Sequence, residues 1–215
     1  MSLTLVIGNR NYSSWSLRPW LAMKQAGLAF DEVRIPLARP DTTAQILRYT
    51  PSGRVPCLID GALAVWDSMA ICEYVNEQYA GGSLWPADVG RRARARSVAA
   101  EMHSGFAALR THLSMDIRAH RPADGAAALA RPQVAAEVAR IHGLWSDCLT
   151  ASGGPFLFGP FSIADAFFAP VVTRFRTYAI PLAAPLARYA DAVFALPAMQ
   201  QWVAAAATEP ETIDD

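Results

Sequence analysis

The chain has 215 residues with 19 basic and 19 acidic side chains, so it is long enough to bury a hydrophobic core and has no net charge to attract nucleic acid or anionic lipid. Its three cysteines, Cys57, Cys72 and Cys148, lack the C-x-x-C spacing of metal and redox sites, which argues against a disulfide framework and favours the reducing cytoplasm. The N-terminal apolar run is too short for a signal peptide and later ones are interrupted by arginine and proline, so we expect neither a secretory leader nor a membrane span.

Residues 1–80 alternate between strand-like and helix-like patterns, which is typical of an α/β unit. The apolar run Leu3–Ile7 predicts a buried strand, and Leu17–Ala26 predicts a helix. Gly27 follows this helix at the position where a left-handed cap is favoured. Residues Phe30–Leu37 alternate like a second strand, so this part of the chain is expected to form a sheet.

A β-hairpin is expected next along the chain. Two short apolar runs, Val55–Asp60 and Leu63–Trp66, have the length of strands. The dipeptide Asp60-Gly61 joins them, and its glycine supplies the positive φ that a tight hairpin turn needs. This dipeptide makes the hairpin the most clearly marked element of the chain.

Arg54, Val55 and Pro56 begin the first hairpin strand. A proline is tolerated there because the start of a strand has no ladder hydrogen bond to lose. The alternative is a cis peptide between Val55 and Pro56. It would turn the Val55 backbone outward, where its N–H and C=O can pair with the backbone of a peptide ligand.

Asp67 and Ser68 open the next predicted helix, Met69–Tyr79. Both residue types cap helices, because their oxygens accept hydrogen bonds from the first backbone N–H groups. The same helix end also offers free N–H groups, the positive end of a dipole and a hydroxyl, a combination that suits a bound carboxylate. Capping and carboxylate binding are therefore alternative interpretations of this pair.

A linker is predicted at residues 81–88, where two glycines and a proline interrupt any periodicity. Strand patterns end there, and alanine, leucine and arginine dominate the rest of the chain. The predicted fold class is α/β plus all-α. An N-terminal α/β domain would span residues 1–80 and an all-helical domain residues 89–215.

Three further motifs are interpreted as structural. Ser162 and Asp165 form a capping-box pattern ahead of an apolar helix, which favours a role in folding. The arginine-rich run at residues 91–96 lacks interleaved aromatic residues, so a solvated helix face is favoured over a nucleic-acid patch. His103 stands alone in its helix, which favours a packed or interface residue over a catalytic base. The histidines show no metal-ligand spacing, and no zinc site is expected.

The order of these features resembles that of the glutathione transferase family: a strand, a serine-bearing loop, a helix, a V-P pair, a hairpin, an acidic-Ser pair at a helix start, and an all-helical second part. The sequence "SSWSLRPWLAM" is most similar to the serine-type zeta class, whose loop reads S-S-C-S-x-R, and Ser13 and Ser14 match its serine pair. Trp15 stands where the zeta class has cysteine. This difference argues against zeta-type isomerisation of maleylacetoacetate and against omega-like thiol exchange, which needs a cysteine in this loop.

The resemblance implies a thioredoxin-like N-terminal domain that binds glutathione, a helical domain that supplies the pocket for an electrophile, and a cytoplasmic homodimer. It also implies roles for single residues. Val55 would pair with the cysteinyl backbone of glutathione. Asp67 and Ser68 would hold its γ-glutamyl group. Arg54 would lie near its glycine carboxylate.

The loop before the first helix is the candidate catalytic centre. Ser14 is preferred over Ser13 as the donor to the glutathione sulfur, because it lies nearer the helix start. Tyr12 is the alternative, because tyrosine-type members of the family carry their donor phenol near this end of the first strand. Tyr12 and Trp15 are also counted among the residues that contact glutathione. No metal is expected at this site.

The helix after this loop is expected to have Ser16 as its N-cap and Pro19 in its first turn. A thiol with a pKa of about 8.5 is mostly protonated at neutral pH, and lowering that pKa by about two units requires about 2.7 kcal/mol. One hydroxyl hydrogen bond to a charged sulfur contributes about 1.5 to 3 kcal/mol. The helix N-terminus adds about 0.3 to 1 kcal/mol. These contributions suffice, so no general base is expected.

The function expected from these features is conjugation of glutathione, as co-substrate, to small hydrophobic electrophiles. One alternative is a glutathione-dependent cis-trans isomerase, similar to maleylacetoacetate isomerase, in which glutathione is a cofactor. Another is a non-catalytic transferase-like module that binds a partner protein. Met102, Phe106 and Met115 are candidates for the electrophile pocket, with a core position favoured for them.

Overall fold

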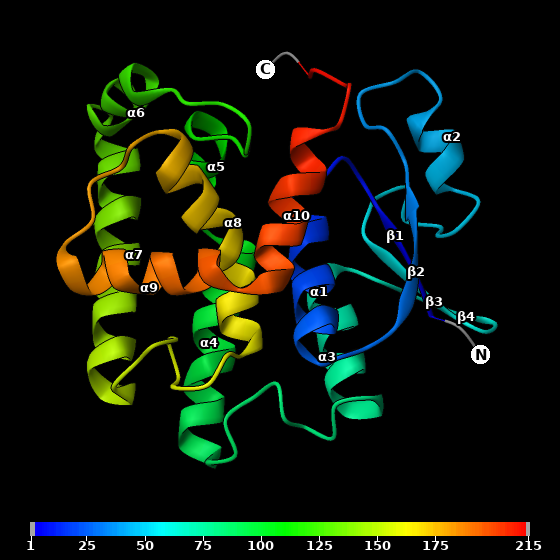
Figure 1. The fold of residues 1–215 in the computed structure, drawn as a ribbon, viewed down its shortest axis with the longest axis horizontal. Helices are drawn as coiled ribbons and strands as arrows, with labels where there is room; N and C mark the ends of the chain where they lie inside the picture. The colour runs from blue at the N-terminus through cyan, green and yellow to red at the C-terminus, as the bar shows by residue number, and fades with distance from the viewer. Residues whose placement is uncertain (1–2, 214–215) are drawn as a thin grey trace.

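The computed structural model describes residues 3–213 of the chain (Figure 1). The strands are β1 (Leu3–Ile7), β2 (Phe30–Arg34), β3 (Cys57–Asp60) and β4 (Leu63–Trp66). The helices are α1 (Ser14–Gln25), α2 (Thr42–Ile46), α3 (Ser68–Gln78), α4 (Val89–Ser104), α5 (Ala107–His112), α6 (Pro122–Leu129), α7 (Pro132–Ser152), α8 (Ile163–Thr177), α9 (Ala184–Ala195) and α10 (Pro197–Ala207). These strands all precede Asp67, and the elements that follow residue 88 are helices.

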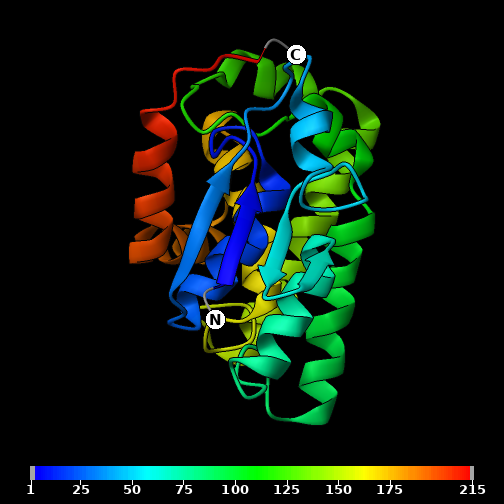
Figure 2. The ribbon, with the colours of Figure 1, turned by 90° about the vertical axis from the view of Figure 1, so that its right-hand side faces the viewer.

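The sheet is covered by helices on both faces. Its strands have the order β2-β1-β3-β4, with β1 parallel to β2 and antiparallel to β3. Leu5 and Ile7 belong to the core that includes α1 and α3, whereas Val6 packs with Ile46 of α2 on the other face. Figures 1 and 2 show α2 on the side of the sheet that faces away from the helical part. This arrangement confirms the α/β class predicted for the first part of the chain.

The predicted hairpin is also confirmed. β3 and β4 are antiparallel, and Asp60 pairs with Leu63, so Gly61 and Ala62 form the turn between them. Gly61 has a φ of 59°, the left-handed conformation that a two-residue hairpin turn requires.

α1 begins earlier than predicted. Ser13 is its N-cap, and the Ser13 Oγ accepts a hydrogen bond from the Ser16 N–H at 3.3 Å. Ser16 itself lies within the helix, where its hydroxyl accepts from the Gly8 N–H at 3.1 Å. Pro19 consequently lies in the helix interior and not in the first turn. The assignment of Ser16 as N-cap was wrong because a contact with the end of β1 uses its hydroxyl.

The segment between β1 and β3 differs from the prediction in two places. β2 ends at Arg34 and not at Leu37, because Pro36 has no backbone N–H with which to continue the ladder. α2 was not predicted, since its 5 residues are too few to show a helical period.

The helical part packs around α8, which is buried along almost its whole length. α1 and α4 both pack against α8, so one hydrophobic core continues from the sheet into the helices. Met102, Phe106 and Met115 belong to this core, as the favoured interpretation expected. No helix between residues 3 and 213 has both the length and the apolar character needed to span a membrane.

The capping box at the start of α8 is confirmed. Asp165 is fully buried, and its Oδ2 accepts hydrogen bonds from the Ser162 N–H at 2.8 Å and the Ser162 hydroxyl at 2.9 Å. Its Oδ1 accepts from the Leu157 N–H at 3.0 Å. Asp165 therefore joins the start of α8 to the loop that precedes it.

We expect Asp165→Ala to lower the free energy of unfolding by about 3 kcal/mol, because it leaves the buried N–H groups of Leu157 and Ser162 without their acceptor. Asp124→Ala is the control, since Asp124 is exposed in the first turn of α6 and should change stability by less than about 0.5 kcal/mol. Urea unfolding followed by circular dichroism measures both. Equal effects of the two substitutions would contradict the folding role of Asp165.

Candidate functional site

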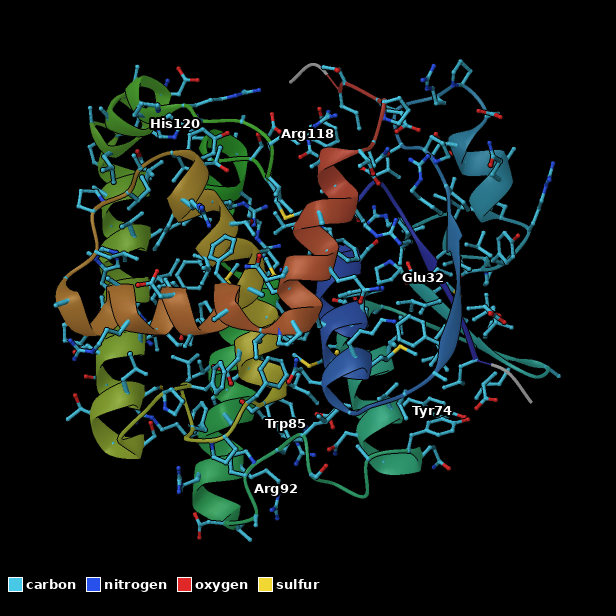
Figure 3. All side chains as sticks on the ribbon, viewed as in Figure 1. Glu32, Tyr74, Trp85, Arg92, Arg118 and His120 are labelled. Atoms are coloured by element: carbon cyan, nitrogen blue, oxygen red, sulfur yellow. The ribbon has the colours of Figure 1, made fainter. Side chains whose placement is uncertain are left out.

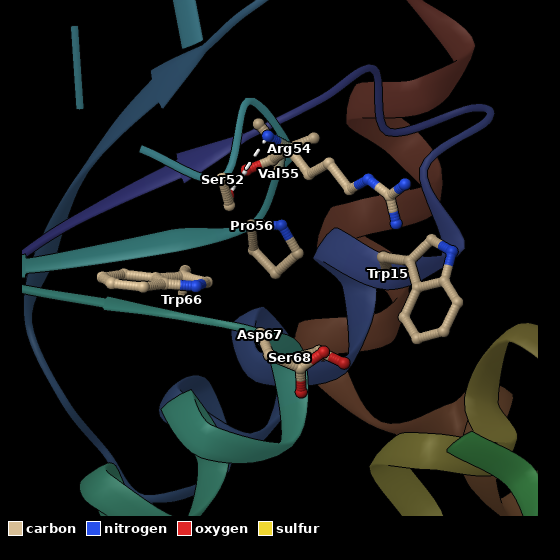
Figure 4. Close-up of a pocket in the computed structure, with 8 residues that line it drawn as sticks. All are labelled: Trp15, Ser52, Arg54, Val55, Pro56, Trp66, Asp67 and Ser68. Atoms are coloured by element: carbon tan, nitrogen blue, oxygen red, sulfur yellow. Dashed lines mark hydrogen bonds between the residues drawn. The ribbon is translucent and has the colours of Figure 1, made fainter. Parts of the chain in front are cut away.

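A cavity of about 460 Å³ lies where the start of α1, the start of α3 and the segment before β3 meet (Figure 4). Its lining consists of Trp15, Ser52, Arg54, Val55, Pro56, Trp66, Asp67 and Ser68. Five candidate glutathione-binding residues are thus brought together by elements far apart in the sequence. Tyr12, Ser13 and Ser14 do not line this cavity, although Ser14 adjoins Trp15 at the start of α1.

The segment before β3 forms one wall of the cavity. The peptide bond between Val55 and Pro56 is cis, the alternative conformation considered for this pair. The Arg54 side chain extends across the cavity toward Trp15 (Figure 4). Ser52 was not predicted, and its hydroxyl accepts a hydrogen bond from the Arg54 N–H at 3.2 Å. Its only signal in the sequence is the turn pattern P-S-G-R before the strand.

The start of α3 forms the opposite wall. Asp67 is the N-cap, and its Oδ1 accepts from the Met69 N–H at 2.8 Å, so capping is confirmed. Asp67 has φ 71° and ψ 135°, a conformation that residues other than glycine rarely adopt. The Ser68 hydroxyl is buried and has no hydrogen-bond partner within residues 3–213. A helix dipole and an unpartnered hydroxyl together suit a carboxylate.

The two candidate serines have different environments. The Ser13 hydroxyl caps α1 and lies 2.7 Å from the Ser16 hydroxyl. Ser14 is the first residue of α1, and none of the hydrogen bonds found between residues 3 and 213 involves its hydroxyl. Both serines are about equally buried, at 5% and 6% exposure. The side chain that is not committed to capping is therefore that of Ser14.

Tyr12 faces the other half of the molecule. Its phenol oxygen accepts hydrogen bonds from Nη2 of Arg118 and from the Ile213 N–H, both at 3.2 Å. Figure 3 shows Arg118 beside the end of α10. The residues that hold Tyr12 thus come from the C-terminal half of the chain.

Arg18 and His103 connect Trp15 to Asp67. The fully buried Arg18 guanidinium lies 4.2 Å from the centre of the Trp15 ring, and its Nη1 lies 3.4 Å from His103 Nδ1. A guanidinium only donates, so Nδ1 is the acceptor and the imidazole proton is on Nε2. That Nε2 lies 3.5 Å from the Asp67 carboxylate. His103 was predicted as a packed or interface residue, and its contact with a site carboxylate had no signal in the sequence.

Burial and the neighbouring arginines keep His103 neutral. Burial lowers its pKa below the ordinary 6.5, Asp67 raises it, and Arg18 and Arg110 lower it, with a net lowering. Burial likewise lowers the pKa of Arg18 to about 9. The imidazole therefore takes up a proton more readily in the unfolded chain than in the folded one. The stability that neutral His103 contributes is present above about pH 6.5 and is lost as the pH falls below that value.

The remaining charged motifs serve the fold. Arg91 donates to the carbonyl of Phe158 at 2.7 Å, and Arg96 pairs with Glu73 at 3.2 Å, so part of the arginine-rich run is engaged within the chain. Within residues 3–213, no group of three or more His, Cys, Asp or Glu side chains is arranged to hold a metal ion.

Comparisons with known proteins point to one family. Residues 12–78 match the family described as glutathione S-transferase, N-terminal domain. Over 65 residues the chain is 38% identical to a dichloromethane dehalogenase of Methylorubrum extorquens, covering 29% of this chain and 23% of that protein. Over 82 residues it is 35% identical to a zeta-class glutathione S-transferase of Euphorbia esula, covering 38% and 36%. The chain thus matches well under half the length of these curated relatives.

A solved structure matches nearly the whole chain. A glutathione transferase homologue from Burkholderia, solved with bound glutathione, has a TM-score of 0.70 and 26% identity to this chain. The match covers 97% of this chain and 99% of the other. The similarity therefore includes the helical part, and the predicted order of a thioredoxin-like domain followed by a helical domain is confirmed.

We expect Asp67→Asn to lower the pKa of His103 further, because it removes the carboxylate charge that favours the protonated imidazole. His142 is the internal control, since burial lowers its pKa as well and Asp67 does not contribute. A proton NMR titration of the imidazole C2 protons, assigned with His103→Gln and His142→Gln, measures both values. Equal shifts of the two histidines would contradict a specific contact with Asp67.

Proposed function

We propose that this chain, whose residues 12–78 match the glutathione S-transferase N-terminal domain, binds glutathione in the Trp15 cavity, stabilises its thiolate and conjugates it to small hydrophobic electrophiles. The observation that carries the proposal is the meeting of three features at one cavity: the first turn of α1, the Val55–Pro56 segment and the capped start of α3. Each matches one chemical part of the tripeptide.

The peptide backbone and carboxylates of glutathione would be held by the two walls of the cavity. Val55 would pair with the cysteinyl backbone as an added strand. The start of α3 would hold the γ-glutamyl group, with the Ser68 hydroxyl donating to its carboxylate and Asp67 balancing its ammonium charge. Arg54 would lie near the glycine carboxylate. These roles use charge and hydrogen bonding that the cavity lining already offers.

The thiol would be ionised by electrostatic stabilisation alone. Ser14 is the proposed donor, because its hydroxyl is not used for capping and it lies at the positive end of α1. One hydrogen bond to the charged sulfur, at about 1.5 to 3 kcal/mol, with the helix N-terminus accounts for a pKa lowered by one to two units. Ser13 would support this arrangement as the cap, and the contacts of Tyr12 with Arg118 and Ile213 disfavour Tyr12 as the donor.

Trp15 would separate this protein from the cysteine-dependent reactions of related proteins. An indole cannot form a mixed disulfide with glutathione, so thiol exchange through this position is excluded chemically. An isomerase that returns glutathione unchanged remains the second candidate, supported by the similarity to the zeta class. Consumption of glutathione in step with product separates conjugation from isomerisation. A non-catalytic module would need no retained glutathione site.

We also propose a homodimer that acts in the cytoplasm. Leu63 and Trp66 on the edge strand β4 are large apolar side chains exposed by 47% and 46% in the single chain. Burial of such a strand edge against a second copy would remove this apolar surface from water.

We expect glutathione to bind with a dissociation constant in or below the millimolar range, and Ser68→Ala to weaken binding about ten-fold by removing a donor to the carboxylate. Isothermal titration calorimetry measures both. Asp88→Asn is the control, because Asp88 also caps a helix, α4, but does not line the cavity. Absence of binding at millimolar glutathione would refute the proposed function.

We expect Ser14→Ala to raise the pKa of the bound thiol by about one to two units, because it removes the donor to the thiolate. Tyr12→Phe should leave that pKa within about half a unit of its value in the unsubstituted protein, and Ser13→Ala should mainly destabilise α1, by about 1 kcal/mol. Ultraviolet titration of the thiolate in the complex measures the pKa. If Tyr12→Phe alone restores an ordinary thiol pKa, the serine assignment is wrong.

A further inference from the structure

The C-terminal segment, residues 208–213, is hydrogen-bonded to the β1–α1 loop, residues 8–13. The Glu209 carboxylate accepts hydrogen bonds from two successive backbone N–H groups of this loop, Arg10 at 2.7 Å and Asn11 at 3.0 Å. Glu209 is buried, at 7% exposure, although it lies beyond the last helix. Figure 1 shows the C-terminal segment passing beside the loop that leaves β1. A buried carboxylate with two backbone donors is a strong, charge-assisted contact.

The two N–H groups that Glu209 accepts from lie at the centre of a tight turn. The Tyr12 N–H donates to the Asn9 carbonyl at 3.2 Å, and the Ser13 N–H donates to the same oxygen at 2.8 Å. Arg10 and Asn11 are therefore the two central residues of the turn, and its own hydrogen bonds do not use their N–H groups. Glu209 supplies an acceptor for each of them. The turn ends at Ser13, the N-cap of α1, directly before Ser14.

Other residues of the helical part hold the same turn. The Trp202 Nε1–H donates to the Arg10 carbonyl at 3.0 Å, and the Arg118 N–H donates to the Asn11 side-chain oxygen at 2.9 Å. Arg118 also donates to the backbone carbonyl of Glu211 at 2.6 Å, which ties the C-terminal segment to the helical part. The helical part thus holds the turn together with the strand-containing part, where the Leu37 N–H donates to the Asn9 side-chain oxygen at 2.7 Å.

From these contacts we infer that Glu209 is a positioning residue for the thiolate donor: its carboxylate fixes the turn at Arg10 and Asn11, and through it the Ser14 hydroxyl. This inference rests on the proposed function, because the donor has a role only if glutathione is bound. Glu209 does not touch the cavity lining, so it acts through the loop. It should therefore affect ionisation of the thiol without affecting the contacts that hold the tripeptide.

The direction in which the thiol pKa changes distinguishes a positioning role of Glu209 from an effect of its charge. Removing a negative charge near the site would by itself stabilise the thiolate and lower the thiol pKa. Losing the turn would misplace the donor and raise the thiol pKa. Glu209→Gln removes the charge and also turns one acceptor into a donor, which then faces a backbone N–H. A positioning role predicts a higher thiol pKa in this variant, and a charge effect predicts a lower one.

Glu211 provides a matched control in the same segment. It is as buried as Glu209, at 8% exposure, and its Oε1 pairs with Arg34 at 2.9 Å. Arg34 also lies 3.8 Å from the Glu209 carboxylate, so both acids share one cationic neighbour. The hydrogen bonds found between residues 3 and 213 give the Glu211 side chain no contact with the N–H groups of the turn. Glu211→Gln therefore removes an equal charge and leaves the hydrogen bonds between Glu209 and the turn intact.

The experiment compares Glu209→Gln, Glu209→Asp and Glu211→Gln in three measurements. We expect Glu209→Gln to raise the pKa of bound glutathione by about one unit, which is a ten-fold smaller ionisation constant. The affinity for S-methylglutathione, which has no thiol to ionise, should stay within about two-fold. Glu209→Asp keeps the charge with a shorter reach and should give an intermediate shift. Hydrogen exchange of a peptide covering residues 8–13 should be faster in Glu209→Gln than in Glu211→Gln.

Each result decides the inference. A thiol pKa that is unchanged or lowered in Glu209→Gln, or raised equally in Glu211→Gln, overturns it. If Glu209→Gln does not fold, a shift in Glu209→Asp with none in Glu211→Gln supports the inference, and no shift overturns it. If the unsubstituted protein binds no glutathione, the proposed function fails and the role of Glu209 in catalysis fails with it. Hydrogen exchange then tests only whether Glu209 holds the turn. Equal exchange of residues 8–13 in the two Gln variants would show that it does not.

Discussion

The Arg18 guanidinium, fully buried where α1 meets α8, is the interaction on which the site depends. Its centre lies 4.2 Å from the ring of Trp15 and 4.8 Å from the ring of Phe167. Burying a charge costs several kcal/mol, and each desolvated cation–π contact returns about 2 kcal/mol. The two ring contacts therefore offset part of that cost. Arg18 thus fixes Trp15, a wall of the cavity, to a helix of the second domain.

The same arginine sets the protonation of His103. Because the guanidinium can only donate, it holds Nδ1 as an acceptor and directs the Nε2 proton toward Asp67. Arg18, His103 and Asp67 thereby form a series of polar contacts that runs from α1 through α4 to the start of α3. The carboxylate at the end of that series caps a helix and also faces the cavity. Folding and ligand binding use the same atoms there.

The two sides of the site are held by different parts of the molecule. Val55 and Ser68 belong to the strand-containing part, and short local contacts position them. The turn before Ser14 is held largely from the helical part, by Glu209 and Trp202. Under the proposed function, tripeptide binding and thiol ionisation would therefore depend on separate sets of contacts. Changes in the helical part would then alter reactivity without altering the proposed glutathione contacts.

Residue types and short spacings predict the local elements of this chain, because the signals for each element lie within a few residues of one another. The strand Leu3–Ile7, the glycine turn at Gly61 and the Asp67 cap follow from residue type and short spacing. The resemblance to a known family then implied roles for these elements, and the cavity brings the corresponding residues together.

Which hydroxyl caps α1 depends on packing between distant segments, because the choice between Ser13 and Ser16 depends on where the end of β1 lies. Such packing also brings His103 to Asp67 and Glu209 to a turn 198 residues away. Such contacts leave no periodic trace in the sequence. They arise where packing of the helical part against the sheet buries polar groups, and each buried donor or acceptor must then find a partner that no local pattern specifies.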